Sequence, residues 1–370
     1  NKIKMIKELI ECNCIKIGNF RLKNGDISKY YFGMKNIISY PELLKKVGDE
    51  IFKKLDDFDI ICGIPYGGLP IATYISTKYN KPLIFIRDEA KKYGMQKLIE
   101  GEYNSDSRCV IIDDVMTTGK SLQETIDKLK GLVNIVDIAV IFNRQQGYNF
   151  TYNVKSLFYK NDVIKYRLNE IKKDKNSKLC FSADIDDKNK ILNILDKIGK
   201  HIVICKIHYD IFEDNSEEFK NDLINMSIKH NFLIMEDRKF NDISYIVEKQ
   251  YSKFCNWVDL VTVHSLVTDD VLSKLCGGLI VANMSNNNYD FTEKALKLAK
   301  NNMNNVIGFI TQNRIECGEL LTLTPGVSNE NTNIKDQKYR NIKEIDSDIF
   351  IVGRAIYNSN NLEDTINNYL

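Results

Sequence analysis

The sequence of 370 residues is longer than one ordinary hydrophobic core serves, which predicts two domains. Hydrophobic residues make up 43% of the chain and charged residues 28%, values typical of globular rather than disordered or fibrous proteins. The 52 basic and 50 acidic residues leave a net charge of only +2, which argues against nucleic acid or an anionic membrane surface as a partner. Small molecules are therefore the expected partners.

Cysteine and histidine usage argues against disulfides and structural metals. The nine cysteines include no C-x-x-C pair, and the four histidines show no spacing typical of metal ligands. This pattern predicts reduced thiols and a cytoplasmic location. No part of the sequence approaches the roughly 18 consecutive apolar residues that a membrane span needs, so we expect no membrane insertion.

In the first half, short runs rich in Ile and Val alternate with amphipathic segments, which predicts an α/β domain with an open parallel sheet. Between 161 and 176 the sequence turns polar and lysine-rich, which predicts a linker between a first domain at 1–160 and a second at 177–370. The expected strands of the first domain lie at 59–64, 82–87, 109–115 and 135–142, and the expected helices at 41–55, 67–79 and 120–131.

The most specific motif of this half is VIIDDVMTTGKS, residues 110–121. A buried strand runs into Asp113 and Asp114, whose carboxylates can accept hydrogen bonds from the hydroxyls of a ribose. A small polar turn follows, which can direct backbone N–H groups and a helix N-terminus at a phosphate. Asp114 stands where a P-loop requires glycine, which excludes an NTPase motif. The turn consists of Thr117, Thr118, Gly119, Lys120 and Ser121.

This motif resembles the phosphoribosyl-pyrophosphate (PRPP) motif of the phosphoribosyltransferases, and three further segments narrow the resemblance to orotate phosphoribosyltransferase. FRLKNG at 20–25 is similar to the family's F-x-L-K-S-G segment, IRDEAKKYG at 86–94 to its mobile loop, and FNRQQG at 142–147 to its orotate-binding segment. The resemblance implies that Mg²⁺ accompanies PRPP, held partly by Asp113 and Asp114. It also implies binding of pyrophosphate or orotate by Lys23, Arg87, Lys91, Thr117 and Arg144.

From residue 179 to the end of the chain, eight short apolar runs alternate with helix-length segments, which predicts a (β/α)8 TIM barrel. Polar residues collect where these runs end, and that is the face at which such barrels place their chemistry. The expected strands lie at 179–184, 201–208, 232–238, 258–264, 277–284, 305–311, 320–326 and 348–353.

The segment EDRKFNDIS, residues 236–244, places Asp237, Lys239 and Asp242 in the pattern D-x-K-x-x-D at the end of the third expected barrel strand. In an extended strand residues 237 and 239 point the same way, so we expect a carboxylate and an ammonium to converge at the barrel mouth. Three such charges in isolation would by default form a solvated surface cluster.

The other strand ends make this half resemble orotidine 5′-monophosphate decarboxylase. SAD at 182–184, KIHYD at 206–210, NMS at 283–285, TPGV at 324–327 and IVGR at 351–354 are similar to that family's segments and follow in the same order, as does the Q-x-Y at 337–339. The resemblance implies a charged array of Lys206, Asp237, Lys239 and Asp242, with Lys239 as proton donor and no cofactor. It also implies substrate contacts by Asp184, His208, Ser285, Pro325, Gln337, Tyr339, Gly353 and Arg354.

Together the two halves resemble the bifunctional UMP synthases, which implies that orotate and PRPP form orotidine 5′-monophosphate (OMP), and that OMP is then decarboxylated to UMP. The resemblance also implies a homodimer in which Asp242 completes the neighbour's site. Two alternatives stay open. Asp88 stands where the transferase family has lysine and Lys29 where it has proline, which allows a weakened transferase or one with another base. Ile246, in place of a threonine, together with the altered segment after Ser285, allows a nucleotide sensor without turnover.

Overall fold

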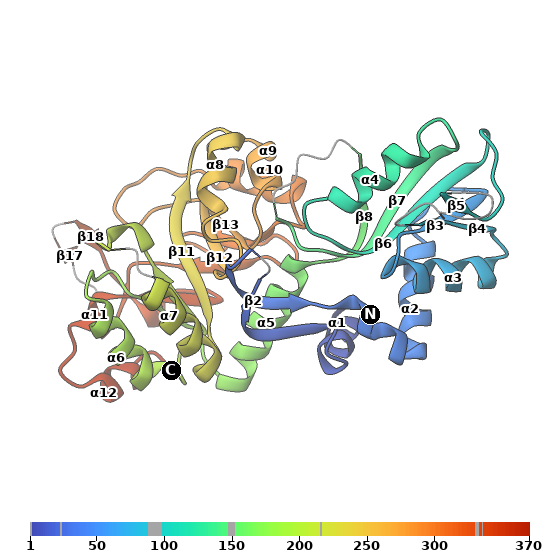
Figure 1. Cartoon of the computed structure of the whole chain (residues 1–370). Coiled ribbons are helices and arrows are strands. Elements are labelled where there is room, and N and C mark those ends of the chain that lie inside the picture. The colour runs from blue at the N-terminus through green and yellow to red at the C-terminus, as the bar shows by residue number, and fades with distance from the viewer. Residues whose placement is uncertain are drawn as a thin grey trace. The chain divides into compact units, whose positions relative to one another are not determined.

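A computed structural model describes residues 2–22, 24–87, 98–146, 152–214, 217–329, 333–334 and 336–370. The chain divides into two compact units (Figure 1). Unit 1 contains Asn1–Lys16 and Tyr31–Asp162, and unit 2 contains Ile17–Tyr30 and Val163–Leu370. Across these described ranges, we find no helix with the length and apolar character that crossing a membrane requires.

Unit 1 is built on a six-stranded sheet in the order β5-β4-β3-β6-β7-β8, in which only the β4–β5 pair is antiparallel. The run Cys109–Ile112 is completely buried, as expected for a parallel strand covered on both faces. The strands are β3 (Ile60–Gly63), β4 (Leu83–Ile86), β5 (Ile99–Glu100), β6 (Arg108–Met116), β7 (Asn134–Asn143) and β8 (Lys155–Tyr159). The helices are α1 (Lys2–Glu11), η1 (Met34–Ser39), α2 (Pro41–Phe52), α3 (Gly68–Tyr79) and α4 (Lys120–Leu129).

The order of these strands creates a point where the winding of the chain reverses. The chain passes from β3 to β4 towards one edge of the sheet and from β6 to β7 towards the other. Because parallel crossovers are right-handed, α3 and α4 cover opposite faces, as Figure 1 shows. The loops that follow β3 and β6 therefore lie at the switch point where open α/β sheets bind ligands.

The open parallel sheet predicted for this half is confirmed, and the structure adds two strands that the sequence does not predict. β5 consists of two residues, too few to form a hydrophobic pattern. β8 is the five-residue segment KSLFY, in which only Leu157 and Phe158 give an apolar signal.

Unit 2 contains a closed barrel of eight parallel strands, which confirms the predicted TIM barrel. Each strand lies within its expected range except β11, which continues to Phe240. The barrel strands are β9 (Leu179–Ser182), β10 (Ile204–Ile207), β11 (Leu233–Phe240), β12 (Leu260–His264), β13 (Gly278–Val281), β14 (Val306–Ile310), β15 (Leu321–Thr324) and β20 (Ile349–Val352). The helices after 175 are α6 (Lys188–Ile198), η2 (Tyr209–Ile211), α7 (Glu217–His230), α8 (Ser244–Tyr251), α9 (Asp269–Ser273), α10 (Thr292–Asn301), η3 (Ile342–Glu344), α11 (Arg354–Tyr357) and α12 (Leu362–Asn367). Short strand pairs are β16 (Val327–Ser328) with β19 (Arg340–Asn341), and β17 (Asn333–Ile334) with β18 (Gln337–Lys338).

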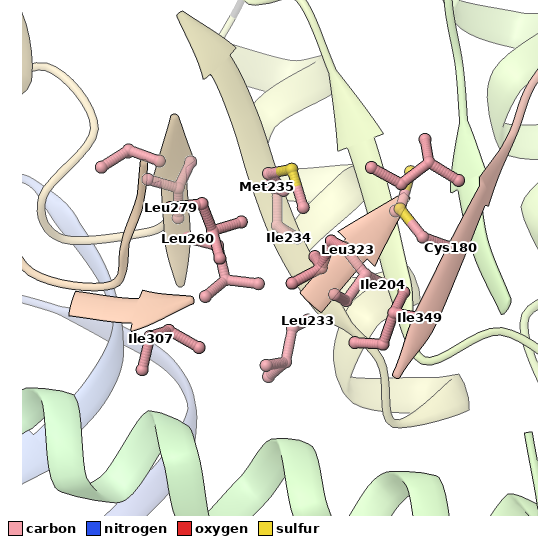
Figure 2. Packing of buried hydrophobic residues seen from close by; sticks show 14 of the residues in the cluster. Cys180, Ile204, Leu233, Ile234, Met235, Leu260, Leu279, Ile307, Leu323 and Ile349 are labelled. Carbon is pink, nitrogen blue, oxygen red and sulfur yellow. The ribbon is translucent and has the colours of Figure 1, made fainter. Parts of the chain in front are cut away.

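Aliphatic side chains from successive strands pack together in the barrel (Figure 2). Leu233, Ile234 and Met235 are consecutive in β11 and all fully buried. Residues that alternate between the two faces of a strand are buried together only when both faces are covered, here by the barrel interior and by the helices. The apolar runs in the sequence are therefore continuous rather than alternating.

An N-terminal hairpin of β1 (Ile15–Arg21) and β2 (Ile27–Phe32) contributes its residues 17–30 to unit 2. Lys29 in this hairpin is fully buried, with its Nζ 2.5 Å from Asp259 Oδ2 and 2.9 Å from Ser227 Oγ. The hydroxyl of Tyr30 donates to Asp259 Oδ1 at 2.5 Å and accepts from Arg167 Nη1 at 2.8 Å. The barrel unit thus includes a segment that lies, in the sequence, between the two parts of unit 1.

Residues 161–176, expected to be a linker, form most of helix α5 (Lys160–Lys175). Ile164, Leu168 and Ile171 of this helix are buried in the core of unit 2. Their spacing of four and three residues is that of one helix face, and the lysines between them hide it in the composition. The compact units therefore differ from the predicted domains at this helix and at the hairpin.

Candidate active sites

A cavity of about 290 Å³ lies in unit 2, lined by residues at and just after the carboxyl ends of the barrel strands. This is the face at which TIM-barrel enzymes carry their active sites. Its lining includes the predicted residues Asp184, Lys206, His208, Asp237, Lys239, Ser285, Pro325, Gln337, Tyr339, Gly353 and Arg354.

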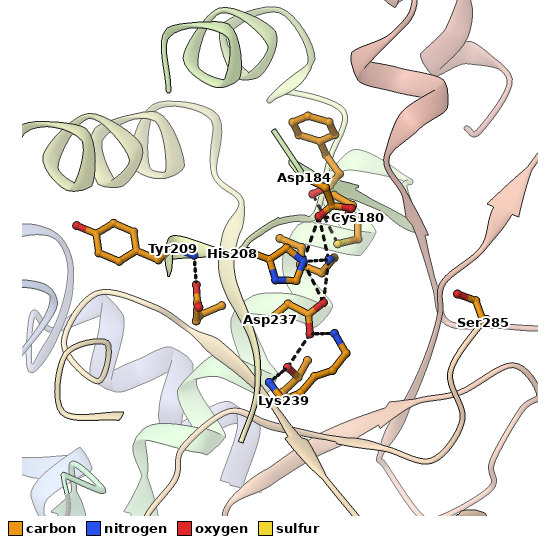
Figure 3. Close-up of polar contacts among 12 residues, drawn as sticks. Cys180, Asp184, His208, Tyr209, Asp237, Lys239 and Ser285 are labelled. Carbon is orange, nitrogen blue, oxygen red and sulfur yellow. Dashed lines mark hydrogen bonds and ion pairs between the residues drawn. The ribbon is translucent and has the colours of Figure 1, made fainter. Parts of the chain in front are cut away.

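Alternating positive and negative side chains form a charged array along one side of this cavity (Figure 3). Lys206 Nζ lies 2.8 Å from Asp237 Oδ2 and 3.2 Å from Asp184 Oδ1. Lys239 Nζ lies 2.8 Å from the other oxygen of Asp237, Oδ1. His208 Nε2 is 3.3 Å from Asp184 Oδ1. Asp237 is therefore held between two ammonium groups.

Lys206 and Asp237, at the centre of the array, are ionised although they are largely shielded from water. The side chains of Lys206 and Asp237 are only 8% and 9% exposed. Burial alone would raise the pKa of Asp237, but the ammoniums of Lys206 and Lys239 outweigh it and hold that pKa well below its usual range. Burial alone would lower the pKa of Lys206. The negative charges of Asp237 and Asp184 outweigh burial and raise that pKa. Both residues are therefore charged at neutral pH.

A bulge in β11 brings Lys239 to Asp237. Glu236 pairs with Val261 of β12, but the next pairing is Phe240 with Val263, so the register of the two strands shifts between them. Lys239 has φ +50° within this bulge, a conformation that costs a non-glycine residue strain energy. Strand alternation predicts the convergence of residues 237 and 239, but the strand that achieves it is irregular.

The opposite part of the cavity carries groups suited to a base and a phosphate. Helix α11 begins at Arg354, whose Nη1 and Nη2 donate to the two carboxylate oxygens of Asp336 at 3.0 and 3.1 Å. The same two donors can hold a phosphate. Gln337 Nε2 donates to Ser285 Oγ at 3.2 Å, and Figure 3 shows Ser285 well apart from the array.

Asp242 is the one predicted decarboxylase residue that the cavity lining, over the described ranges, does not include. It is exposed, and its Oδ1 accepts a hydrogen bond from Ile243 N at 2.7 Å. Ile243 and Tyr245 beside it are large apolar side chains that are 67% and 64% exposed. Within one chain, then, the structure does not bring Asp242 to the array.

Sequence reasoning missed a threonine behind the array. Thr262 in β12 is 1% exposed, and its hydroxyl contacts both Asp237 and the backbone of Lys239. Its signal in the sequence is the single hydroxyl of the otherwise apolar run LVTV at 260–263. Ser182, part of the SAD segment but given no role from the sequence, has its Oγ 2.9 Å from each carboxylate oxygen of Asp184.

In unit 1, Asp113 and Asp114 lie near the carboxyl end of β6, beside the switch point of the sheet. Asp113 Oδ2 accepts from Ser121 Oγ at 3.0 Å, which ties the acid to the first turn of α4. Burial, followed by the charge of Asp114, raises the pKa of Asp113 to about 7. A cation bound by the carboxylates of Asp113 and Asp114 would reduce the repulsion between their charges.

Two glycines after β3 allow the neighbouring loop to approach these acids. A Cβ on Gly67 would lie 2.1 Å from the Asp114 carboxylate, and one on Gly68 would lie 2.3 Å from Ile112 O. A larger residue at Gly68 would collide with the backbone of β6, and one at Gly67 would displace the Asp114 side chain. Neither glycine belongs to a motif recognised in the sequence, although Pro65–Gly68 (PYGG), shortly after β3, is a turn signal.

Arg144 and the turn at 117–121, whose last two residues begin α4, lie at the same edge of the sheet. Gly119, with φ +79°, precedes α4, which begins at Lys120. Arg144 follows β7, and its N donates to Met116 O at 3.0 Å, which puts it beside the turn that contains Thr117 and Thr118.

The predicted pyrophosphate ligands are only partly described by the structure. Arg87 follows β4, with its Nε 2.6 Å from Glu100 Oε1. Lys23 and Lys91 lie outside the described residues. Over the described ranges, no three or more His, Cys, Asp or Glu side chains gather as a metal site. Asp113 and Asp114 are a pair, which suits Mg²⁺ that takes its other ligands from water and substrate phosphates.

Two family models together match most of the chain. Residues 177–369 match the model described as Orotidine 5′-phosphate decarboxylase / HUMPS family, and residues 33–170 match the Phosphoribosyl transferase domain. The chain is 31% identical to Uridine 5′-monophosphate synthase of Bos taurus, covering 96% of this chain and 93% of that protein. It is 28% identical to Uridine 5′-monophosphate synthase of Caenorhabditis elegans, and the match covers 97% of this chain and 92% of that protein. It is 35% identical to Orotidine 5′-phosphate decarboxylase of Pichia kudriavzevii, and the match covers 52% of this chain and 84% of that protein.

Proposed function

The chain belongs to the bifunctional uridine 5′-monophosphate synthases, and on this premise we propose which of its residues carry each reaction. It is an enzyme of de novo pyrimidine synthesis that transfers a phosphoribosyl group from PRPP to orotate and then decarboxylates the resulting OMP to UMP. The bifunctional activity predicted from the sequence is thereby confirmed. The residues that perform it are the subject of the proposal.

Lys239 is the proton donor of the decarboxylation. The bond between C6 of the base and the carboxylate breaks, the electron pair stays on C6, and CO₂ leaves. An ammonium beside C6 stabilises the developing carbanion and then gives it a proton, which water later restores to the lysine. Lys239 is held at 2.8 Å by Asp237, so its charge is fixed before the substrate arrives. No cofactor takes part in these steps.

The other residues of the cavity bind and orient OMP. Asp184, Lys206 and His208 form hydrogen bonds with one another at one side, where they can exchange these for bonds to ribose hydroxyls. Binding energy from a phosphate far from C6 can favour the transition state. Ser285, Gln337, Tyr339 and Arg354 bind the base and the phosphate. Pro325 and Gly353 line the cavity beside them.

In unit 1, Asp113 and Asp114 bind the ribose hydroxyls of PRPP and would hold the Mg²⁺ that accompanies it. Bound Mg²⁺ supplies charge neutralisation for the leaving pyrophosphate. The turn 117–121 binds the 5-phosphate, and Arg144 binds orotate. The hydrogen bond from Ser121 to Asp113 supports this assignment, because it links the ribose-binding acid to the phosphate-binding turn. Arg87, Lys23 and Lys91 are assigned to pyrophosphate from the resemblance.

The active decarboxylase is a homodimer in which Asp242 reaches the array of the neighbouring chain. Asp242 lies outside its own cavity, and Ile243 and Tyr245 beside it leave large apolar surfaces exposed. Exposed apolar groups next to an active-site motif are typical of a subunit interface.

The observation that carries the decarboxylase assignment is Asp237 bound to two lysines in the barrel cavity. Two variants assayed with supplied OMP separate chemistry from binding. Lys239→Ala should reduce kcat by at least about a thousandfold, because it removes the proton donor and a preorganised charge. Arg354→Ala should mainly raise KM. If Lys239→Ala changes KM and leaves kcat near the parent value, the role given to Lys239 is wrong.

A further inference from the structure

We infer that Thr262 is a positioning residue of the decarboxylase site, one that holds both the Asp237 carboxylate and the backbone of Lys239 in place. This inference rests on the proposed function of the array. Thr262 lies in β12, is 1% exposed and does not line the cavity. Its Oγ1 donates to Asp237 Oδ1 at 2.7 Å and accepts from Lys239 N at 2.8 Å.

The direction of these two bonds is determined by the donors available. A backbone N–H can only donate, so Thr262 Oγ1 must accept the bond from Lys239 N. The single hydroxyl proton of Thr262 is then directed at Asp237 Oδ1. That oxygen therefore receives donors from Thr262 and from Lys239 Nζ, while the other carboxylate oxygen receives Lys206. A carboxylate with donors at both oxygens stays ionised and cannot rotate without losing one of them.

The bond to Lys239 N has a second role, because it stabilises the bulge. In a regular parallel pair this N–H would bond to a carbonyl of β12, but the shift of register between Glu236 and Phe240 interrupts the ladder there. A buried N–H without an acceptor costs about 1–3 kcal/mol. Thr262 supplies the acceptor and so allows Lys239 its φ of +50°.

One hydroxyl thus fixes the proposed proton donor through its backbone and the adjacent carboxylate through its side chain. Preorganised charge accelerates a reaction only while it is held in position. Thr262→Val keeps the shape of the side chain but leaves Lys239 N without its acceptor and Asp237 without one donor. A hydrogen bond to a charged group is worth up to about a hundredfold in rate.

The test compares full-length variants with supplied OMP. Thr262→Val and Thr262→Ala should each reduce kcat about 10- to 100-fold and change KM less than about twofold, because phosphate and ribose contacts remain. Thr262→Ser retains the hydroxyl and should recover most of the parent kcat. The matched control is Thr322→Val, since Thr322 is also a fully buried barrel threonine that accepts a backbone N–H, from Ile315 at 3.1 Å.

Thr322→Val should lose thermal stability but keep the parent kcat, and orotate transfer should be unaffected in every variant. The inference is overturned if Thr262→Val is as active as Thr322→Val, or if Thr262→Ser is as slow as Thr262→Val. The use of Ala as well as Val keeps the test valid if one of them does not fold. A decarboxylase that tolerates Lys239→Ala would instead refute the proposed function itself.

Discussion

Charged side chains at the barrel mouth are ordered before any substrate binds. Asp237 is nearly buried between Lys206 and Lys239, and its pKa is held low by their charges against the opposing effect of burial. Reorganising such groups during the reaction would cost energy that a fixed array avoids. Most of these residues could be predicted because motifs place them at strand ends. Thr262 could not, because its role depends on a bulge that no local pattern of the sequence reveals.

In the part of the cavity proposed to bind phosphate, Asp336 should compete with the substrate for Arg354. Its carboxylate holds both Nη donors at 3.0 and 3.1 Å, the donors that a phosphate would take. Asp336→Asn should therefore lower KM for OMP about two- to fivefold, the range of an exposed ion pair, with kcat unchanged.

The matched control for that variant is Asp346→Asn, which breaks the exposed pair between Asp346 and Arg314, away from the cavity lining. Steady-state kinetics at low and moderate salt make the comparison. A raised KM in Asp336→Asn would mean that Asp336 holds Arg354 in the productive position instead of competing with phosphate.

Among the elements, the N-terminal hairpin carries a departure from the family pattern that stabilises the folded structure. Lys29, which stands where the transferase family has proline, is buried against Asp259 in unit 2. The buried ion pair with Asp259 gives this departure from the family pattern a structural explanation, so Lys29 is no argument for a weakened transferase. The sequence could not predict this ion pair, because its partners are more than 200 positions apart.

Lys29→Met should destabilise unit 2, because it leaves Asp259 buried without its nearest cation. Breaking one partner of a buried pair costs about 3 kcal/mol or more. For a unit of this size we expect the midpoint of heat inactivation of the decarboxylase to fall by roughly 6–12 °C. Lys229→Met, which breaks an exposed pair with Asp196, is the control and should change the midpoint little. Equal midpoints for the two variants would contradict the role of Lys29.

Helix α5 illustrates a second limit of sequence reasoning at this scale. The three buried positions Ile164, Leu168 and Ile171 are enough to pack a helix, yet the surrounding lysines make the segment look like a linker. The eight barrel strands were predictable for the opposite reason. Their two covered faces require continuous apolar runs, which composition does not hide.

At the scale of the whole molecule, the two reactions should be separable by mutation. Asp113→Asn combined with Asp114→Asn removes the proposed ligands of ribose and Mg²⁺ in unit 1. We expect orotate transfer to fall at least about a hundredfold, because charged ligands are lost, while decarboxylation of supplied OMP stays at the parent rate. Transfer that persists unchanged would show that the motif at 110–121 is not the PRPP site.

The proposed dimer predicts complementation between two inactive variants. Lys239→Ala and Asp242→Ala chains should each be nearly inactive in decarboxylation. In a mixed dimer one site carries both lesions and the other carries none. Random pairing of equal amounts would leave about a quarter of all sites intact. Co-expressed chains with confirmed mixed dimers but no recovered activity would place Asp242 in its own chain's site or outside the chemistry.

The most direct test of the account follows orotate, OMP and UMP together, after Lys239→Ala protein receives orotate, PRPP and Mg²⁺. Orotate should disappear at the rate of the parent protein, because the acids and loops of unit 1 are unchanged. OMP should accumulate in an equal amount, and UMP should not form above the uncatalysed rate. Formation of UMP near the parent rate would contradict the assignment of Lys239 as the proton donor of the second reaction.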